Sequence, residues 1–301
     1  MSGTGPVRLY SLLEDRPNTR ALLNGELTSP LFEFDFVETK KANRYFKAIV
    51  RDLAFDFGEL ALVTAMQAKV YGKPYSLLPA TVIGRYQHHT IFYNADNGPL
   101  SAAELNGKRV GVRAYSQTTG IWLRSILAGD YGVDIPGISW VTTEEAHVAE
   151  YEDPPYVVRA PEGRTLLDLL MEHDLDAAIL GDREEEGPIR YLIPDHESAA
   201  RDHARRTGGI PINHIAIVRS ALVESRPDVV RELYRLLKES RMRTEPPPGG
   251  ADDSLRFGRR ALQPAVERLA EASLAQGLIP RPLSMDELFG DTLAILGDDA
   301  A

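Results

Sequence analysis

Segments with the two-residue period of strands alternate along this chain with segments that have the period of helices. Strand patterns occupy VRLYSLL (7–13), FEFDFVE (32–38) and PYSLLPATV (74–82), and a helical pattern occupies NRYFKAIVRDL (43–53). Between them, FDFGEL begins as a strand and is expected to turn at Gly58 into a helix. Such alternation favours an α/β fold with a mostly parallel sheet flanked by helices.

A second alternating set follows the first. Its predicted strands are KRVGV (108–112), ISWV (138–141) and AAIL (177–180), and its predicted helices include IWLRSIL (121–127) and RTLLDLLMEH (164–173). Ser101 to Glu104 has the spacing of a capping box. A last strand, HIAIVRS (214–220), comes after this set, so the simplest closure returns the chain to the first sheet. We therefore predict a discontinuous lobe 1 (1–95 and 213–301), a lobe 2 (96–212) and a ligand at the hinge.

Charge and composition exclude several classes of partner. The chain carries 44 acidic and 34 basic side chains, a formal charge of −10, which argues against a nucleic acid or a membrane as partner. An anionic ligand must therefore meet locally concentrated positive charge. The absence of cysteine excludes disulfides and sulfur-rich metal sites. With no signal-like N-terminus and no apolar run near 18 residues, we expect a cytoplasmic protein. Phosphate-loop and dinucleotide glycine motifs are missing, and we expect no cofactor.

Several segments in order carry a family resemblance: NRYFKAIVRD, FDFGELALVTAM, RYQHHTIFYN, ELNGKRVGVRAYSQTTGIWLRSILAGDYGVD and GGIPINHIAIVR. Over most of residues 7–240 the chain resembles the 4,5-dihydroxyphthalate decarboxylase family of the type 2 periplasmic-binding-protein superfamily. The resemblance implies a two-lobe fold with an interlobe cleft, and decarboxylation of a hydroxylated aromatic carboxylate without a redox cofactor. It is also compatible with a homo-oligomer. This chain departs from the family beside the expected ligand, at Gln87, His89, Arg113 and Ala114.

Decarboxylation of a hydroxylated aromatic ring needs an acid that delivers a proton to the ring carbon, and histidine suits that task at neutral pH. His88 corresponds to the histidine of the family and is the first candidate for general acid, or for orienting the substrate carboxylate. In an extended backbone His89 would point to the opposite side, so one of the two is expected to be structural. A metal held by His88, His89 and a carboxylate is an alternative, but adjacent strand histidines diverge, so we expect no metal site here.

Two further residues are candidates for proton transfer. His214 lies at the start of the returning strand and could be a second acid or base, with Asn213 beside it as a weaker candidate donor. Glu59 could orient a histidine or accept a proton from a ring hydroxyl. A strand-edge histidine and a glutamate that complements a helix dipole are the structural alternatives, and they have nearly equal weight.

The loop YSQTTG (115–120) is the clearest anion site in the sequence. Ser116, Thr118 and Thr119 come with backbone amides at a predicted helix start, where a carboxylate can bind, although serine and threonine there are usually helix caps. Arg113 or Arg85 could add positive charge, and Tyr115 could flank an aromatic ring. We therefore expect the amides near Tyr115 to hold a small anionic aromatic substrate opposite the imidazole of His88.

Two functions remain open from the sequence. The leading interpretation is a cofactor-independent decarboxylase of a small hydroxylated aromatic or heteroaromatic carboxylate. The alternative is a non-catalytic solute-binding protein or sensor for a small anion, which would use the same cleft.

Overall fold

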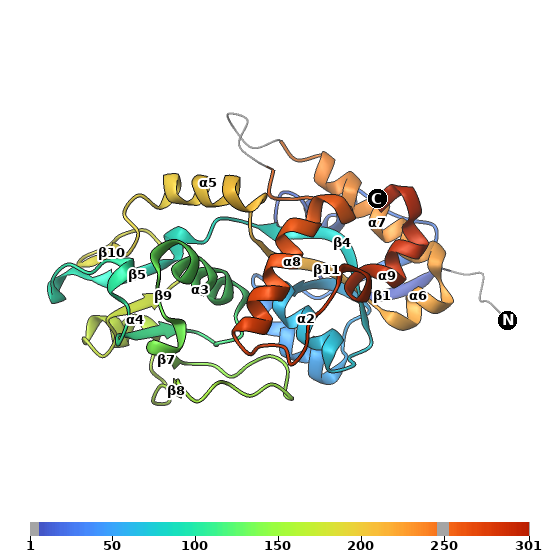
Figure 1. The fold of residues 1–301 in the computed structure, drawn as a ribbon. Coiled ribbons are helices and arrows are strands. Elements are labelled where there is room, and N and C mark those ends of the chain that lie inside the picture. The colour runs from blue at the N-terminus through green and yellow to red at the C-terminus, as the bar shows by residue number, and fades with distance from the viewer. Residues whose placement is uncertain (1–5, 246–252, 301) are drawn as a thin grey trace. The chain divides into compact units, whose positions relative to one another are not determined.

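The computed structural model describes residues 6–245 and 253–300 and divides the chain into two compact units (Figure 1). Unit 1 comprises Met1–Arg85, Ile212–Ala270 and Ile279–Ala301, and unit 2 comprises Tyr86–Pro211 and Glu271–Leu278. Residues 86–95 group with unit 2, whereas the sequence interpretation placed them in lobe 1, because Ile91–Tyr93 pair with Ala177–Ile179 of that unit. Residues 271–278 also group with unit 2, whereas the sequence interpretation placed them in lobe 1. Gln276, in this segment, accepts a hydrogen bond from Arg124 Nε of unit 2 at 2.6 Å, which accounts for the difference.

Unit 1 contains a five-stranded sheet in the order β2-β1-β3-β11-β4. Its strands are β1 (Val7–Leu12), β2 (Phe32–Phe36), β3 (Phe57–Ala61), β4 (Tyr75–Gly84) and β11 (Ile212–Arg219). β1 is parallel to β2 and β3, and β11 is antiparallel to both of its neighbours, β3 and β4. Four strands therefore run in one direction and β11 alone runs against them.

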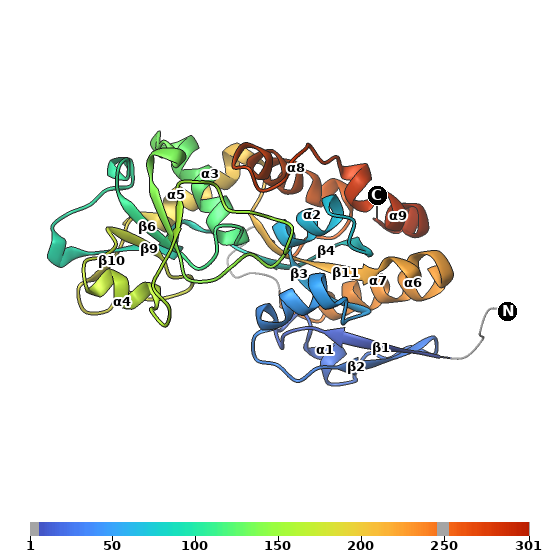
Figure 2. The same ribbon diagram turned by 90° about the horizontal axis from the view of Figure 1, so that it is seen from below.

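Helices cover both faces of this sheet. They are α1 (Arg20–Leu23), α2 (Leu62–Val70), α6 (Ser220–Ser225), α7 (Pro227–Met242), α8 (Arg259–Ala275) and α9 (Met285–Leu296), and the unit boundary falls within α8. Figure 2 shows α2 and α7 on opposite sides of the sheet. The chain ends in the short turn η8 (Gly297–Ala300). The helix expected over 43–53 is present but irregular, because it runs without a break from the 3₁₀ turn η1 (Ala42–Tyr45) into the π-helical turn η2 (Ala48–Asp52).

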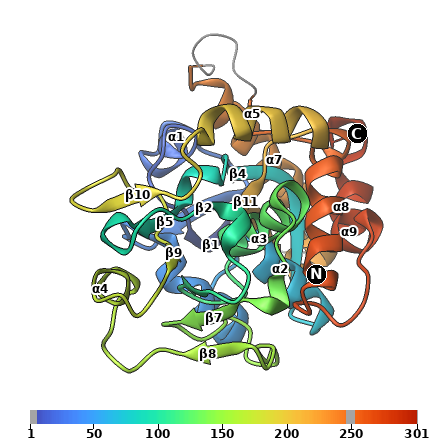
Figure 3. The ribbon, with the colours of Figure 1, turned by 60° about the vertical axis from the view of Figure 1, so that its left-hand side comes forward.

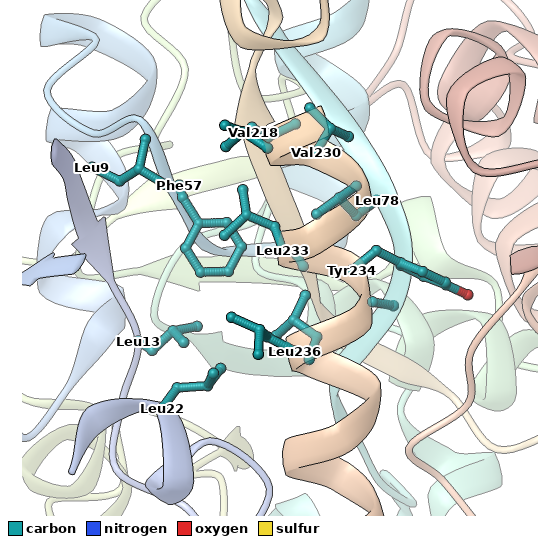
Figure 4. Close-up of a cluster of buried hydrophobic side chains, with 14 of the residues drawn as sticks. Leu9, Leu13, Leu22, Phe57, Leu78, Val218, Val230, Leu233, Tyr234 and Leu236 are labelled. Atoms are coloured by element: carbon teal, nitrogen blue, oxygen red, sulfur yellow. The ribbon is translucent and has the colours of Figure 1, made fainter. Parts of the chain in front are cut away.

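The core of unit 1 lies between the sheet and α7 (Figure 4). Leu233 and Leu236 of α7 are 0% and 1% exposed and face Leu9, Phe57 and Val218 of the sheet. Burial of each such side chain contributes about 1.5–3 kcal/mol, so this interface fixes the strands relative to one another. The strands that carry functional side chains are thereby held on a rigid support.

Unit 2 contains a six-stranded sheet in the order β10-β5-β9-β6-β7-β8. Its strands are β5 (Ile91–Asn94), β6 (Arg109–Val112), β7 (Ser139–Thr142), β8 (Val157–Arg159), β9 (Ala177–Ile179) and β10 (Ile189–Tyr191). β9, β6, β7 and β8 are mutually parallel, and β5 is antiparallel to β9 and β10. This sheet also has a single reversed strand, and the expectation of mostly parallel sheets is confirmed.

The helices of unit 2 are α3 (Thr118–Tyr131), α4 (Leu166–Met171) and α5 (His196–Thr207) (Figure 3). The short turns are η3 (His88–Thr90), η4 (Ala95–Asn97), η5 (Ala102–Glu104) and η6 (Ile135–Gly137). The capping box predicted for Ser101 and Glu104 is present at η5. Helix α5 was not predicted, because its sequence HESAARDHARRT offers few apolar residues at helical spacing.

The predicted turn at Gly58 is wrong. Gly58 lies inside β3, which continues to Ala61 before α2 begins. A Cβ atom at Gly58 would lie 2.6 Å from the carbonyl oxygen of Leu12 in the neighbouring strand. The glycine therefore allows a close approach of two strands. None of the helices in the described ranges is long and apolar enough to span a membrane.

Candidate active site

Glu59 and His214 meet on one face of the unit 1 sheet because of the strand register. His214 of β11 is paired with Ala61 of β3, and Glu59 is paired with Ala216. Residues two apart on a strand share a face, so Glu59 and His214 are diagonal neighbours. Phe57 and Ala216, on the same face, belong to the apolar core. The apolar face thus gives way to a titratable pair toward the carboxyl end of β3, where open α/β sheets commonly bind ligands.

A network of hydrogen bonds holds the Glu59 carboxylate. His214 Nδ1 lies 2.6 Å from Glu59 Oε2, Arg16 Nη1 donates to Oε1 at 2.8 Å, and the amide of Glu14 donates to Oε1 at 2.7 Å. Arg16 also pairs with Glu14 Oε2 at 2.8 Å, and the amide of Ala42 donates to the same oxygen at 3.0 Å. Both Glu14 and Arg16 follow the carboxyl end of β1, so the loop after one strand completes the site on the next.

The electrostatics of Glu59 favour its charged form. Its side chain is 0% exposed, and this burial by itself would raise the carboxyl pKa. The hydrogen bond and charge of His214, with the charge of Arg16, outweigh burial and hold the pKa of Glu59 below its usual value. Glu59 is therefore a buried carboxylate that fixes the orientation of His214.

His214 is held in one orientation and its side chain is partly exposed. Its Nδ1 faces Glu59, its ring packs edge-on against Phe46 with centroids 5.1 Å apart, and its side chain is 17% exposed. Within the described residues its Nε2 makes no hydrogen bond. The pairing of β11 with β4 is irregular on both sides of His214, and such irregularities often re-aim a side chain at functional sites. The geometry suits a histidine that exchanges a proton through Nε2.

His88 lies in unit 2 and in a different environment. It is 1% exposed, and neither ring nitrogen has a hydrogen-bond partner. Its ring lies edge-on to that of His203, with centroids 5.5 Å apart, and His203 Nδ1 lies 2.8 Å from Asp130 Oδ2. Burial, reinforced by the neighbouring His203, lowers the pKa of His88 to about 4. His88 is accordingly a neutral imidazole at pH 7.

The adjacent histidine makes separate contacts. His89 Nε2 lies 2.8 Å from Asp182 Oδ1, and the His89 side chain is 27% exposed. His88 and His89 diverge as expected, but they do so in the 3₁₀ turn η3 and not in an extended strand. The sequence analysis predicted no metal site at His88 and His89. In the structure His88 lies instead near Asp130 and His203, and these three side chains offer ligand atoms within 4.8 Å of one another.

The loop before α3 is buried. Ser116, Thr118 and Thr119 are each 3% exposed, and Tyr115 is 0% exposed with its hydroxyl 3.0 Å from that of Tyr156. Burial raises the pKa of the Tyr115 hydroxyl, which is therefore neutral. Gln117, the residue before α3, makes no side-chain cap.

A buried arginine lies beside this loop. Arg124 is 0% exposed, its guanidinium lies 3.7 Å from the centre of the Tyr115 ring, and its Nη2 donates to the Tyr115 carbonyl at 2.6 Å. Its Nη1 has no partner. Arg113, expected to supply charge here, lies 3.4 Å from Glu144. The positive charge behind the loop therefore comes from Arg124.

His88 lies near the last turn of α3, at the opposite end of that helix from the loop that contains Tyr115. Asp130, beside His88, is in the last turn of α3, and Thr118 is its first residue. Twelve residues at the helical rise separate these two positions by about 18 Å along the axis. We correct the expectation that the amides near Tyr115 hold an anion opposite His88, because a single small ring would have to reach both ends of α3.

The other candidates have no assigned role. Arg85 is half-buried at the end of the first segment of unit 1. Asn213 is 4% exposed and precedes His214 in β11. The register of β11 against β4 shifts between Ile212 and His214, so strand alternation does not assign Asn213 to a face of the sheet.

Sequence reasoning missed the partners of the two sites. Arg16 and Glu14 lie in a polar segment that follows a predicted strand, a position that could have singled them out. Asp130 falls in the segment GDYGVD, which was noted only for the family resemblance. His203 lies seven residues after His196 in the helix that was not predicted.

Comparison with known proteins gives the family. A 4,5-dihydroxyphthalate decarboxylase of Comamonas testosteroni is 28% identical to this chain over 90% of the chain and 92% of that protein. A 4,5-dihydroxyphthalate decarboxylase of Pseudomonas putida is 30% identical over 62% of this chain and 77% of that protein. The chain belongs to the 4,5-dihydroxyphthalate decarboxylase family. No family model matches the sequence.

Solved structures confirm the fold of this family member. The periplasmic aliphatic sulphonate binding protein SsuA from Escherichia coli aligns with a TM-score of 0.60 at 12% identity, covering 94% of this chain and 92% of that one. The desulfurization enzyme DSZB aligns with a TM-score of 0.54 at 14% identity, covering 97% and 99%. The periplasmic-binding-protein-like fold is therefore established, and it serves both a binding protein and an enzyme.

Proposed function

We propose that this protein is a decarboxylase of a small hydroxylated aromatic carboxylate and that His214 carries the proton to the ring. Two relatives over most of the chain are named for that chemistry. The observation that supports the role of His214 is its 2.6 Å hydrogen bond to the buried carboxylate of Glu59. Binding of the substrate between the two lobes and the formation of a homo-oligomer stay predictions.

The reaction exchanges one carbon–carbon bond for one carbon–hydrogen bond. A ring hydroxyl pushes electron density toward the carbon that bears the carboxylate, and protonated His214 delivers a proton from Nε2 to that carbon. The bond to the carboxylate then breaks, CO2 leaves, and the ring regains its aromaticity. The imidazole takes up a proton from solvent to complete the cycle, and no redox step is needed.

Glu59 is a positioning residue in this scheme. Its carboxylate accepts the Nδ1 proton of His214 and so fixes the tautomer and stabilises the imidazolium, the role that a buried carboxylate has in other histidine pairs. Arg16 and the Glu14 amide hold that carboxylate in turn. A supported acid of this kind is typically worth about 10²–10⁴ in rate.

His214 is preferred to His88 as the proton donor. With its pKa lowered to about 4, His88 holds almost no proton at pH 7. His88 is also 1% exposed, whereas the His214 side chain is 17% exposed. A histidine that donates a proton must hold that proton at the working pH, which the buried His88 does not.

The experiment is to incubate the purified protein with hydroxybenzoates and hydroxyphthalates in D2O. We expect released CO2 and one deuterium at the ring carbon that carried the carboxylate. His214→Gln should lower kcat about 10²-fold or more. His173→Asn, at an exposed histidine with a positive φ that asparagine tolerates, is the matched control and should retain full turnover.

Two outcomes count against the proposal. Stabilisation by a ligand without CO2 from any compound would support a solute-binding protein or sensor. Turnover that is unchanged in His214→Gln would reject the assigned proton donor while the decarboxylase activity stands. Glu59→Gln should lower kcat with little change in KM, and Glu59→Asp should restore part of the lost kcat. This pattern separates a positioning role of Glu59 from a purely structural one.

A further inference from the structure

We propose that His88, Asp130 and His203 form a binding site for a divalent transition-metal ion of the zinc class in unit 2. The site does not depend on the proposed function, because Glu59 and His214 are residues of unit 1. The bound ion has a structural role. It links the turn η3, the end of α3 and the helix α5, which are far apart in the sequence (Figure 3).

The geometry brings three suitable donors together. One ligand atom from each of the three side chains lies within 4.8 Å of the other two. Around a tetrahedral ion with bonds of 2.0–2.1 Å, neighbouring donors are about 3.3 Å apart. Side-chain shifts of about 1 Å would therefore close the group around an ion.

The second observation is the isolation of the His88 imidazole. Both ring nitrogens are buried without a hydrogen-bond partner, which is rare for a buried polar side chain and costs free energy. A metal bond through one nitrogen would satisfy this ring. The adjacent His89, by contrast, already has a carboxylate partner in Asp182.

The donor set selects the class of ion. Two imidazole nitrogens and one carboxylate oxygen suit zinc and similar transition ions, whereas magnesium and calcium prefer oxygen alone. The Asp130 side chain is 16% exposed and that of His203 is 8% exposed, so water can reach a fourth position. Arg206 lies 2.9 Å from Asp130 Oδ2 and can orient that carboxylate from outside the metal shell.

The test uses the full chain after treatment with a chelator, with Co²⁺ as a coloured substitute for Zn²⁺. We expect one Co²⁺ per chain, with the visible absorption of a four-coordinate site, and displacement of Co²⁺ by Zn²⁺. His203→Gln and His88→Gln should each weaken binding by about tenfold or more. His89→Gln is the matched control, because it removes an adjacent histidine that also faces a carboxylate, and it should bind as the wild type does.

A second measurement, on the wild type, tests the proposal even if the variants fail to fold. In the wild type, nitrogen NMR of the seven imidazoles should show large shifts for two rings when Zn²⁺ is added. The thermal midpoint should rise at the same time. The proposal is overturned if Co²⁺ gives no four-coordinate spectrum, if fewer than two rings respond, or if the folded variants bind as tightly as the control.

Discussion

The buried imidazole of His88 makes the stability of unit 2 depend on pH. Folding lowers the pKa of this group from its ordinary 6.5 to about 4, so between these values the unfolded chain binds more protons than the folded one. The stabilisation is complete above pH 6.5 and is lost as the pH falls toward 4. Its full size is about 3 kcal/mol, because one pKa unit corresponds to about 1.4 kcal/mol.

The perturbation is acidification from about pH 7 to about pH 4.5, compared between the wild type and His88→Met, which fills a similar volume without a titrating group. Over this range the pKa difference corresponds to a loss of about 2.5 kcal/mol of unfolding free energy in the wild type alone. All other groups titrate in both proteins, so the difference between the two losses isolates His88.

The assay is urea unfolding followed by tryptophan fluorescence, with a chelator present to exclude metal binding. Both tryptophans of the chain, Trp122 and Trp140, are buried in unit 2, so the signal reports the unit that contains His88. If the wild type and His88→Met lose the same free energy on acidification, within about 0.5 kcal/mol, then the imidazole is not held neutral by burial and the reasoning is refuted.

Three other substitutions test contacts described above. Glu59→Gln leaves Arg16 without its buried partner and should lower the unfolding free energy by about 3 kcal/mol in urea titrations; a loss below about 1 kcal/mol would contradict the network. Gly58→Ala places a Cβ against the Leu12 carbonyl and should cost about 2 kcal/mol by the same measurement, whereas a neutral effect would mean that the strands part freely. Arg124→Met removes a buried cation that forms hydrogen bonds but has no carboxylate among its partners. The unfolding free energy, followed by tryptophan fluorescence, should change by less than about 1 kcal/mol, and a larger loss would mean that the Arg124 charge stabilises the fold.

The sequence predicted the elements better than their contacts. Periodicity located β1, β4 and β11, and the return of the chain at β11 followed from its position after the second set. Glu59 was suspected of orienting a histidine, but its pairing with His214 depends on the register between β3 and β11, and no turn of the chain fixes that register. His203 was missed because a polar helix leaves little periodic signal. These failures share one cause, since periodicity is local and both sites join distant segments.

The position of β11 affects the order in which the chain folds during its synthesis. This strand lies between β3 and the edge strand β4, so β4 cannot join the first sheet until residue 219 has left the ribosome. Residues 86–211 are synthesised within that interval, and we expect most of unit 2 to collapse before unit 1 can close. Nascent chains that stop short of β11 would therefore leave β4 without a partner strand and one edge of β3 unpaired, and chaperones would be needed most at that stage.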